Sequence, residues 1–220
     1  MIDHVSMFIE PDGPEIARME AAGLVETYRR SHPGQGTRNV CYCFDNLFLE
    51  LLWVDEPDAA RSATIARTRL YERSLWRTNG ACPFGIAWRR PSLHPALTVP
   101  TWTFTPPYLP DGMSIPVATD SDDVRQPMMF ESPGAAAPIE WPPEKRGSLQ
   151  HDAGFGVVRE ILLMMPPESP PSAALQAIGA RCVPHLRLGQ SSMYAMHIRV
   201  ASLNQKPDLM LSFPLQASTD

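Results

Sequence analysis

The chain has 220 residues and a mass of 24.4 kDa, which is enough to bury a core as one large domain or two small ones. A hydrophobic content of 44% and a charged content of 20% are typical of a globular protein. The formal net charge is −5 and the chain has no basic block, which argues against nucleic acid or an anionic membrane as the main partner.

The four cysteines are Cys41, Cys43, Cys82 and Cys182. A single C-x-C pair without a second close pair is a poor zinc signature. The sequence has no signal-peptide pattern and no long apolar run, so we expect a reducing cytoplasm. The four thiols are then free and packed as small buried hydrophobes.

The first 55 residues predict a βαβββ module. Its elements are a strand over 2–9, a helix over 15–22 stopped by Gly23, and strands over 24–30, 37–45 and 47–54. Strand alternation puts His4 on the same face as Ile2, Ser6 and Phe8.

A Gly-rich turn, His32-Pro-Gly-Gln-Gly-Thr-Arg-Asn39, precedes the last two strands of this module. We expect His32 to shape the turn with its glycines, and Thr37 and Asn39 to hydrogen-bond within it. In the last strand Glu50 has leucine on both sides, and a buried carboxylate needs a cation, a proton or a hydrogen-bond donor. The module therefore raises the question whether His4 and Glu50 meet over a ligand.

Residues 56–80 predict a connector, helical over 55–76 and ended by Asn79-Gly80. A degraded second module follows over 81–133. It has strands over 83–89, 101–104, 113–118 and 127–131, with 92–97 in place of the short helix. Because Leu47-Phe-Leu-Glu50 aligns with Met128-Met-Phe-Glu131, we expect both fourth strands to end in an acid at the same register.

Residues 134–153 are rich in Pro and Ala and predict a loop, and a third, reduced βαβββ-like module is predicted over 154–216. Its elements are strands over 157–165, 183–188, 194–201 and 209–213, with a helix over 172–178. The fold class is therefore α+β, with repeated βαβββ modules forming a cupped mixed sheet in one compact domain.

A βαβββ unit with His in its first strand and Glu in its last resembles the vicinal-oxygen-chelate superfamily, which includes glyoxalase I, bleomycin-resistance proteins and extradiol dioxygenases. The runs Asp3-His4-Val5, His32-Pro-Gly-x-Gly-Thr-x-Asn39 and Leu49-Glu-Leu51 are similar to the glyoxalase-like domain family. Pro127-Met-Met-Phe-Glu131 resembles that family's second-module motif, although Met128 and Ser132 replace its usual aromatic residues. The resemblance covers roughly residues 1–165.

The resemblance implies two modules around a cleft, with metal ligands at His4, Glu50 and Glu131. The fourth ligand position falls near Gly85 or Ile86, neither of which has a ligating side chain. One histidine and two carboxylates suit a divalent cation, whose identity the sequence does not fix. In this scheme Glu131 is also a candidate catalytic residue, which leaves the metal and moves a proton.

Two functions follow from the resemblance. The first is a metal-dependent lyase or isomerase acting on a small oxygenated metabolite. The alternative is a metal-free protein of the same fold that binds or sequesters a small molecule. In that case its cup would be lined by side chains such as Trp53, Trp88, Trp102, Met128 and Met129.

Three arrangements of the third module stay open. It covers the open side of the cup, or it pairs with its copy across a homodimer axis. In the last arrangement it pairs with the first module, so that Glu160 and Ser212 replace Ile86 and Glu131 in the cleft.

Overall fold

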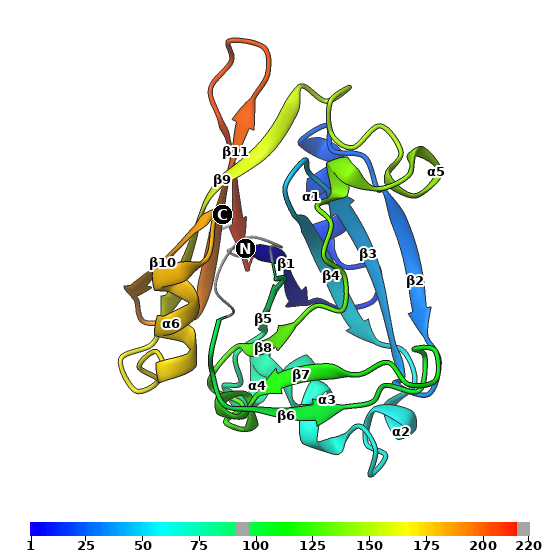
Figure 1. The fold of residues 1–220 in the computed structure, drawn as a ribbon. Coiled ribbons are helices and arrows are strands. Elements are labelled where there is room, and N and C mark those ends of the chain that lie inside the picture. The colour runs from blue at the N-terminus through cyan, green and yellow to red at the C-terminus, as the bar shows by residue number, and fades with distance from the viewer. Residues whose placement is uncertain (91–96, 215–220) are drawn as a thin grey trace.

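The computed structural model describes residues 1–90 and 97–214. Two β-sheets form its framework, one of eight strands and one of four, with helices packed around them (Figure 1). The strand order of the larger sheet is β2-β3-β4-β1-β5-β8-β7-β6, with both parallel and antiparallel pairs. The predicted α+β class with a large mixed sheet is thus confirmed.

The N-terminal half of the large sheet has the predicted order of elements. These are β1 (Ile2–Phe8), α1 (Pro14–Ala21), β2 (Tyr28–His32), β3 (Thr37–Cys43) and β4 (Phe48–Val54). The largest difference from the prediction is at β2, which begins four residues later than 24–30. β1 pairs in parallel with β4, so that Ser6 lies opposite Glu50.

The connector is a series of short helical turns instead of the helix predicted over 55–76. They are α2 (Pro57–Ala60), η1 (Ala66–Thr68), α3 (Leu70–Ser74) and α4 (Trp76–Asn79). Arg69 interrupts the helical path because its φ of 58° is left-handed. Gly80, with a φ of 71°, ends the last turn where the sequence predicts an end.

The second half of the sheet contains β5 (Phe84–Trp88), β6 (Thr101–Phe104), β7 (Ile115–Ala118), η2 (Thr119–Asp122) and β8 (Met128–Glu131). Residues 92–96 of the predicted short helix lie outside the described residues. β5 pairs antiparallel with β1. It also pairs in parallel with β8, in the same way that β1 pairs in parallel with β4. The first and second modules therefore share one sheet. The segment predicted as a loop contains η3 (Pro138–Glu140) and α5 (Pro143–Arg146).

The C-terminal part has the βαβββ order but pairs its strands differently from the first module. Its elements are β9 (Phe155–Met165), α6 (Ala173–Arg181), β10 (His185–Gln190), β11 (Ala195–Ser202) and β12 (Leu209–Phe213). The sheet order is β10-β9-β11-β12, so the first strand lies beside the second instead of the last. α6 also continues through Gly179, where the sequence predicts a stop.

The main core lies between the large sheet and the C-terminal sheet, with α1 and α6 included (Figure 1). Val5 and Met7 of β1 enter this core together with Ile161 of β9 and Ile198 of β11. Because β1 alternates, His4, Ser6 and Phe8 face the opposite side of the sheet. The C-terminal sheet therefore covers the back of the large sheet, in contrast to the expectation that it covers the open side of the cup.

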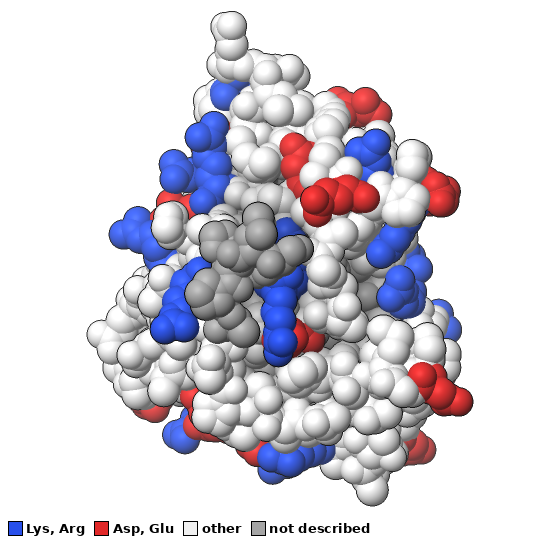
Figure 2. Space-filling view, viewed as in Figure 1, with Lys and Arg blue, Asp and Glu red and all other residues white. Residues whose placement is uncertain are grey.

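The outer face of the C-terminal sheet has a group of charged residues, and Figure 2 shows cationic side chains along this side of the molecule. Glu160 forms ion pairs with Arg187 at 3.0 Å and with Arg199 at 2.9 Å. Ser212 Oγ and His197 Nδ1, on neighbouring strands of the same sheet, form a hydrogen bond at 2.9 Å. Glu160 and Ser212 therefore do not enter a cleft with the first module, contrary to the third predicted arrangement.

The four cysteines are buried with free thiols. In the described part of the chain, no helix has the length and apolar character needed to cross a membrane.

Candidate functional site

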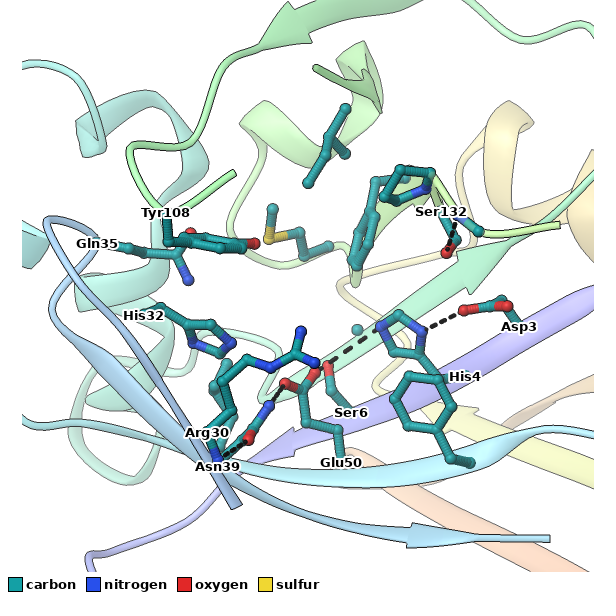
Figure 3. Close-up of a pocket in the computed structure, with 18 of the residues that line it drawn as sticks. Asp3, His4, Ser6, Arg30, His32, Gln35, Asn39, Glu50, Tyr108 and Ser132 are labelled. Carbon is teal, nitrogen blue, oxygen red and sulfur yellow. Dashed lines mark hydrogen bonds and ion pairs between the residues drawn. The ribbon is translucent and has the colours of Figure 1, made fainter. Parts of the chain in front are cut away.

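A cavity of about 240 Å³ lies on the face of the large sheet opposite the main core (Figure 3). Both halves of the sheet contribute walls. The apolar walls include Phe8, Phe48, Leu52, Phe84, Phe104 and Phe130. The polar groups come mainly from the first half, namely Asp3, His4, Arg30, His32, Asn39 and Glu50.

Asp3, His4 and Glu50 form a line of polar groups at one end of the cavity (Figure 3). His4 Nδ1 lies 2.8 Å from Asp3 Oδ2, and His4 Nε2 lies 3.8 Å from Glu50 Oε2. Burial raises the pKa of Asp3, but the hydrogen bond and charge of His4 and the charge of Arg89 outweigh it, so this pKa is lowered. An ionised carboxylate only accepts, which assigns the Nδ1 proton to His4 and leaves Nε2 facing Glu50.

Arg89 supports this line from behind the cavity. Its Nη1 donates to Asp3 Oδ1 at 3.2 Å, and its Nη2 donates to the Asn46 carbonyl at 2.7 Å. The Arg89 and Asp3 side chains are 2% and 5% exposed, so the pair is largely shielded from water. Arg89 thus balances the charge of the carboxylate that orients His4.

The carboxylate of Glu50 is held by its neighbour across the sheet. Asn39 on β3 donates its side-chain amide to Glu50 Oε1 and accepts from the Arg30 backbone N–H at 3.0 Å. Asn39 therefore orients Glu50, whereas the sequence predicts a hydrogen bond within the turn. The His4 ring, which faces Glu50, stacks on Phe48 with a centroid separation of 4.3 Å. This contact fixes the orientation of the His4 ring.

The Gly-rich turn places His32 at the other end of the cavity. Its Nδ1 lies 2.8 Å from Thr37 Oγ1, and Thr37 Oγ1 accepts from Gln35 Nε2 at 2.8 Å. Burial lowers the pKa of His32, and the charge of Arg30 adds to this, while the charge of Glu50 opposes it. His32 is therefore a neutral ring that lines the site, in addition to its predicted part in the turn.

The turn also joins the two halves of the cup. Gly34 has a φ of 76°, and a Cβ there would lie 2.8 Å from Pro107 Cβ. This close approach brings the next residue, Tyr108, against His32, with ring centroids 4.7 Å apart. Glycine is required here because it permits both the left-handed backbone and the close contact.

Glu131 is not part of the polar line. It accepts from Trp88 Nε1 at 3.3 Å and forms an ion pair with Arg90 at 2.9 Å. Met128 and Phe130 of the same strand line the cavity, so alternation directs Glu131 to the other face. Glu50 and Glu131 therefore face opposite sides of the large sheet.

The described residues do not fit a resident metal ion well. They contain no group of three or more His, Cys, Asp or Glu side chains placed to hold one. Of the predicted ligands, only His4 and Glu50 face each other, and at the fourth position Gly85 lines the cavity without a side chain. The ligand set of His4, Glu50 and Glu131 stays a prediction that the geometry does not assemble.

The tryptophans expected to line the cup lie elsewhere. Trp53 and Trp88 belong to the main core together with Met129, and Trp102 packs on a second apolar cluster. Met128 lines the cavity as expected.

Sequence reasoning missed three functional side chains, Asp3, Arg30 and Tyr108. Arg30 was predictable from His32, because residues two apart on a strand lie on the same face of the sheet. Asp3 and Tyr108 had no such signal, because their positions depend on Arg89 and on the Gly34–Pro107 contact.

Comparison with known proteins finds a family-model match for the N-terminal part. Residues 2–95 match the family model of the glyoxalase-like domain. No curated protein matches the chain. A solved structure of a hypothetical protein from Staphylococcus aureus is similar, with a TM-score of 0.49, 12% identity, and coverage of 88% of this chain and 87% of that chain.

A second similar structure is methylmalonyl-CoA epimerase in complex with methylmalonyl-CoA and NH4+. Its TM-score is 0.40 at 15% identity, covering 62% of this chain and 96% of that chain. The resemblance inferred from the sequence motifs is confirmed over residues 2–95, which match the model of the glyoxalase-like domain family.

Proposed function

We propose that the cavity binds a small oxygenated metabolite and that His4 and Glu50 move a proton on it, in an isomerase or lyase reaction. The observation that supports this proposal is the 3.8 Å separation of His4 Nε2 and Glu50 Oε2 inside the cavity. This distance is too long for a hydrogen bond between the two groups. It leaves a ring nitrogen and a carboxylate oxygen directed at the same space, where a ligand C–H or O–H fits.

The protein groups suffice for a balanced proton transfer. One of the two bases takes a proton from the carbon next to a carbonyl group, and the C–H electrons form the C=C bond of an enolate. The carbonyl oxygen becomes an oxyanion in the same step. Return of the proton to the carbon or to a neighbouring atom gives the isomer, and loss of a leaving group gives the lyase product. Neither route consumes an oxidant or a reductant.

Asp3 and Asn39 act as positioning residues in this scheme. Asp3 holds the His4 ring through Nδ1, so that Nε2 faces the ligand. Asn39 occupies one oxygen of Glu50 and leaves the other directed toward His4. The walls leave the His4 and Glu50 side chains only 10% and 13% exposed, which limits the access of water to the pair.

The metal-free binding protein is the second candidate, and the aromatic character of the cavity supports it. Tyr28, Phe48 and Trp141 form a continuous cluster, with Phe48 centroids 6.4 Å from Tyr28 and 5.8 Å from Trp141. Such a surface binds a flat apolar ligand without any chemistry. This candidate predicts tight binding that does not depend on Glu50.

Solvent deuterium exchange distinguishes the candidates. The protein is incubated in D₂O with a panel of small 2-oxo acids, 2-hydroxy ketones and 2-hydroxy aldehydes, and proton NMR follows the loss of signal beside the carbonyl group. We expect enzyme-dependent exchange for a subset of the panel. Glu50→Gln and His4→Gln should each slow this exchange by a factor on the order of 100 or more.

Two further variants sharpen the test. Glu160→Gln, on the outer face of the C-terminal sheet, should exchange at the wild-type rate. Glu131→Gln should do so as well, whereas the metal set predicted from the sequence requires it to lose exchange together with a bound divalent cation measured by elemental analysis. Exchange that persists in both Glu50→Gln and His4→Gln would refute the proposed proton transfer.

A further inference from the structure

The end of the cavity beside His32 has hydrogen-bond donors that have no acceptor within the described structure. Arg30 forms none of the side-chain hydrogen bonds or ion pairs found among residues 1–90 and 97–214, although it lines the cavity. Its guanidinium carbon lies 5.5 Å from the centre of the Tyr28 ring. The Tyr108 hydroxyl likewise has no hydrogen-bond partner among these residues.

These donors lie on the same side of Glu50. Figure 3 shows Arg30, His32 and Tyr108 extending into the space next to the Glu50 carboxylate, from β2 and from the loop between β6 and β7. Burial lowers the pKa of His32 and raises the pKa of Tyr108, and the charge of Arg30 adds to the first shift and opposes the second. The cavity thus has a basic group at one end and the His4–Glu50 pair beside it.

The formal charges of the cavity wall leave one positive charge unbalanced when both histidines are counted as neutral. Asp3 is neutralised by Arg89, which lies behind the wall. The remaining lining charges are the anion Glu50 and the cations Arg30 and Lys145. Lys145 is partly engaged, with its Nζ 3.8 Å from the centre of the Trp141 ring. A ligand with a single negative charge completes this balance.

We propose that Arg30, with Tyr108 and His32 beside it, binds the carboxylate of the ligand, and that the ligand class is therefore small monocarboxylic acids with a carbonyl group. The planar guanidinium of arginine matches a carboxylate with two parallel hydrogen bonds. The cavity of about 240 Å³ limits the ligand to a short chain. The identity of the reacting end rests on the proposed function, but the carboxylate subsite does not require any reaction.

Equilibrium binding tests the subsite without relying on catalysis. The probes are 2-oxo acids of three to six carbons and the primary amides of the same acids, measured by titration calorimetry at pH 7. An amide keeps the shape of the acid and removes its charge. We expect at least one acid to bind about tenfold or more tightly than its amide, which is the size expected for a charge-assisted bidentate contact.

Arg29 is a matched control for Arg30. It is the preceding residue on β2, and its side chain forms ion pairs with Glu26 at 2.8 Å and with Asp12 at 3.1 Å. Arg30→Gln should reduce the affinity for the acid to the level of the affinity for the amide. The affinity for the amide should stay unchanged. Arg29→Gln should change neither affinity. Tyr108→Phe should reduce the affinity for the acid by a smaller factor than Arg30→Gln does.

Each result decides between the subsite and its absence. Equal binding of acid and amide, a preference that survives Arg30→Gln, or failure of every acid to bind at millimolar concentration would overturn the proposed subsite. A preference lost in Arg30→Gln supports it, even if the deuterium exchange test fails. Exchange that proceeds equally on acids and amides would support the proton transfer and overturn the subsite, so that the two failures are distinguishable.

Discussion

Replacing Asp3 with Asn tests whether the acid that orients His4 is held by a buried ion pair. Asn has nearly the same shape but leaves the Arg89 guanidinium, which is 2% exposed, without its counter-charge. Breaking a buried pair in this way typically costs about 3–5 kcal/mol. Asn still accepts a hydrogen bond, and Arg89 keeps its contact with the Asn46 carbonyl, so we expect the lower end, about 3 kcal/mol.

The pH dependence of this loss provides a second readout. The pKa of Asp3 is lowered from its ordinary value of 3.8, so the folded state favours the ionised form. The stabilisation is therefore complete above pH 3.8 and is lost as the pH falls through the lower pKa of the folded state. The difference in free energy of unfolding between wild type and Asp3→Asn should stay constant near pH 7 and shrink below about pH 4.

Urea denaturation followed by tryptophan fluorescence measures this difference at each pH. Asp123→Asn is the control, because Asp123 also has a lowered pKa but pairs with Arg125 at the surface. Exposed pairs contribute at most about 1 kcal/mol. Equal losses in the two variants, or a loss in Asp3→Asn that does not diminish in acid, would refute the reasoning about the buried pair.

Four further substitutions test the Gly-rich turn with a matched glycine control, the connector and His32. Gly36→Ala should destabilise the protein by about 2–3 kcal/mol in urea, since its φ is 76° and the new Cβ would overlap the Glu56 carbonyl oxygen. Gly23→Ala, with a φ of 79° and no atom within 4 Å of its Cβ, should cost about 1 kcal/mol. Arg73→Met should cost about 3 kcal/mol or more, because the fully buried guanidinium donates to several backbone carbonyls of the 121–126 loop. The lowered pKa of His32 means that wild-type stability declines as the pH falls below 6.5, and His32→Gln should flatten this decline.

The outcomes that contradict these predictions are specific. Equal costs for the two glycine variants would mean that the Glu56 contact is unimportant. A melting temperature of Arg73→Met within about 1 °C of wild type would show that the loop carbonyls find other partners. An unchanged slope with pH in His32→Gln would assign the decline to other groups.

Local sequence patterns predicted most elements of the large sheet, because strand alternation and glycine stops act over a few residues. The connector was predicted poorly, because the left-handed conformation at Arg69 has no signal in its neighbours. The C-terminal part shows another reason. Its order of elements was predictable, but the placement of β10 beside β9 depends on contacts distant in the sequence.

The candidate site was predictable where one residue type in one strand was informative. Glu50 is predictable as a site residue because it is a carboxylate between leucines, and His4 because it is a polar residue in an apolar strand. The structure brings these two side chains together. The match of Glu131 to Glu50 rests only on aligned residue types. A shift of one residue in a strand is enough to turn a side chain to the opposite face of the sheet. Asn39 was assigned to the turn because nothing local indicates a partner 11 residues later.

The two halves of the large sheet contribute unequally to the cavity, and this has a consequence for how the protein can change. Residues up to Glu50 supply most of the groups that hold charge and protons, and Lys145 adds a cation, whereas β5 to β8 supply mainly bulk, with Tyr108 as the polar exception. Substitutions at Ile115 or Met128 would reshape the space for a ligand without replacing an ionisable group. Under the proposed function, changes in the second half alone would alter which ligands fit, in evolution or in the laboratory, while the acid–base groups of the first half stay the same.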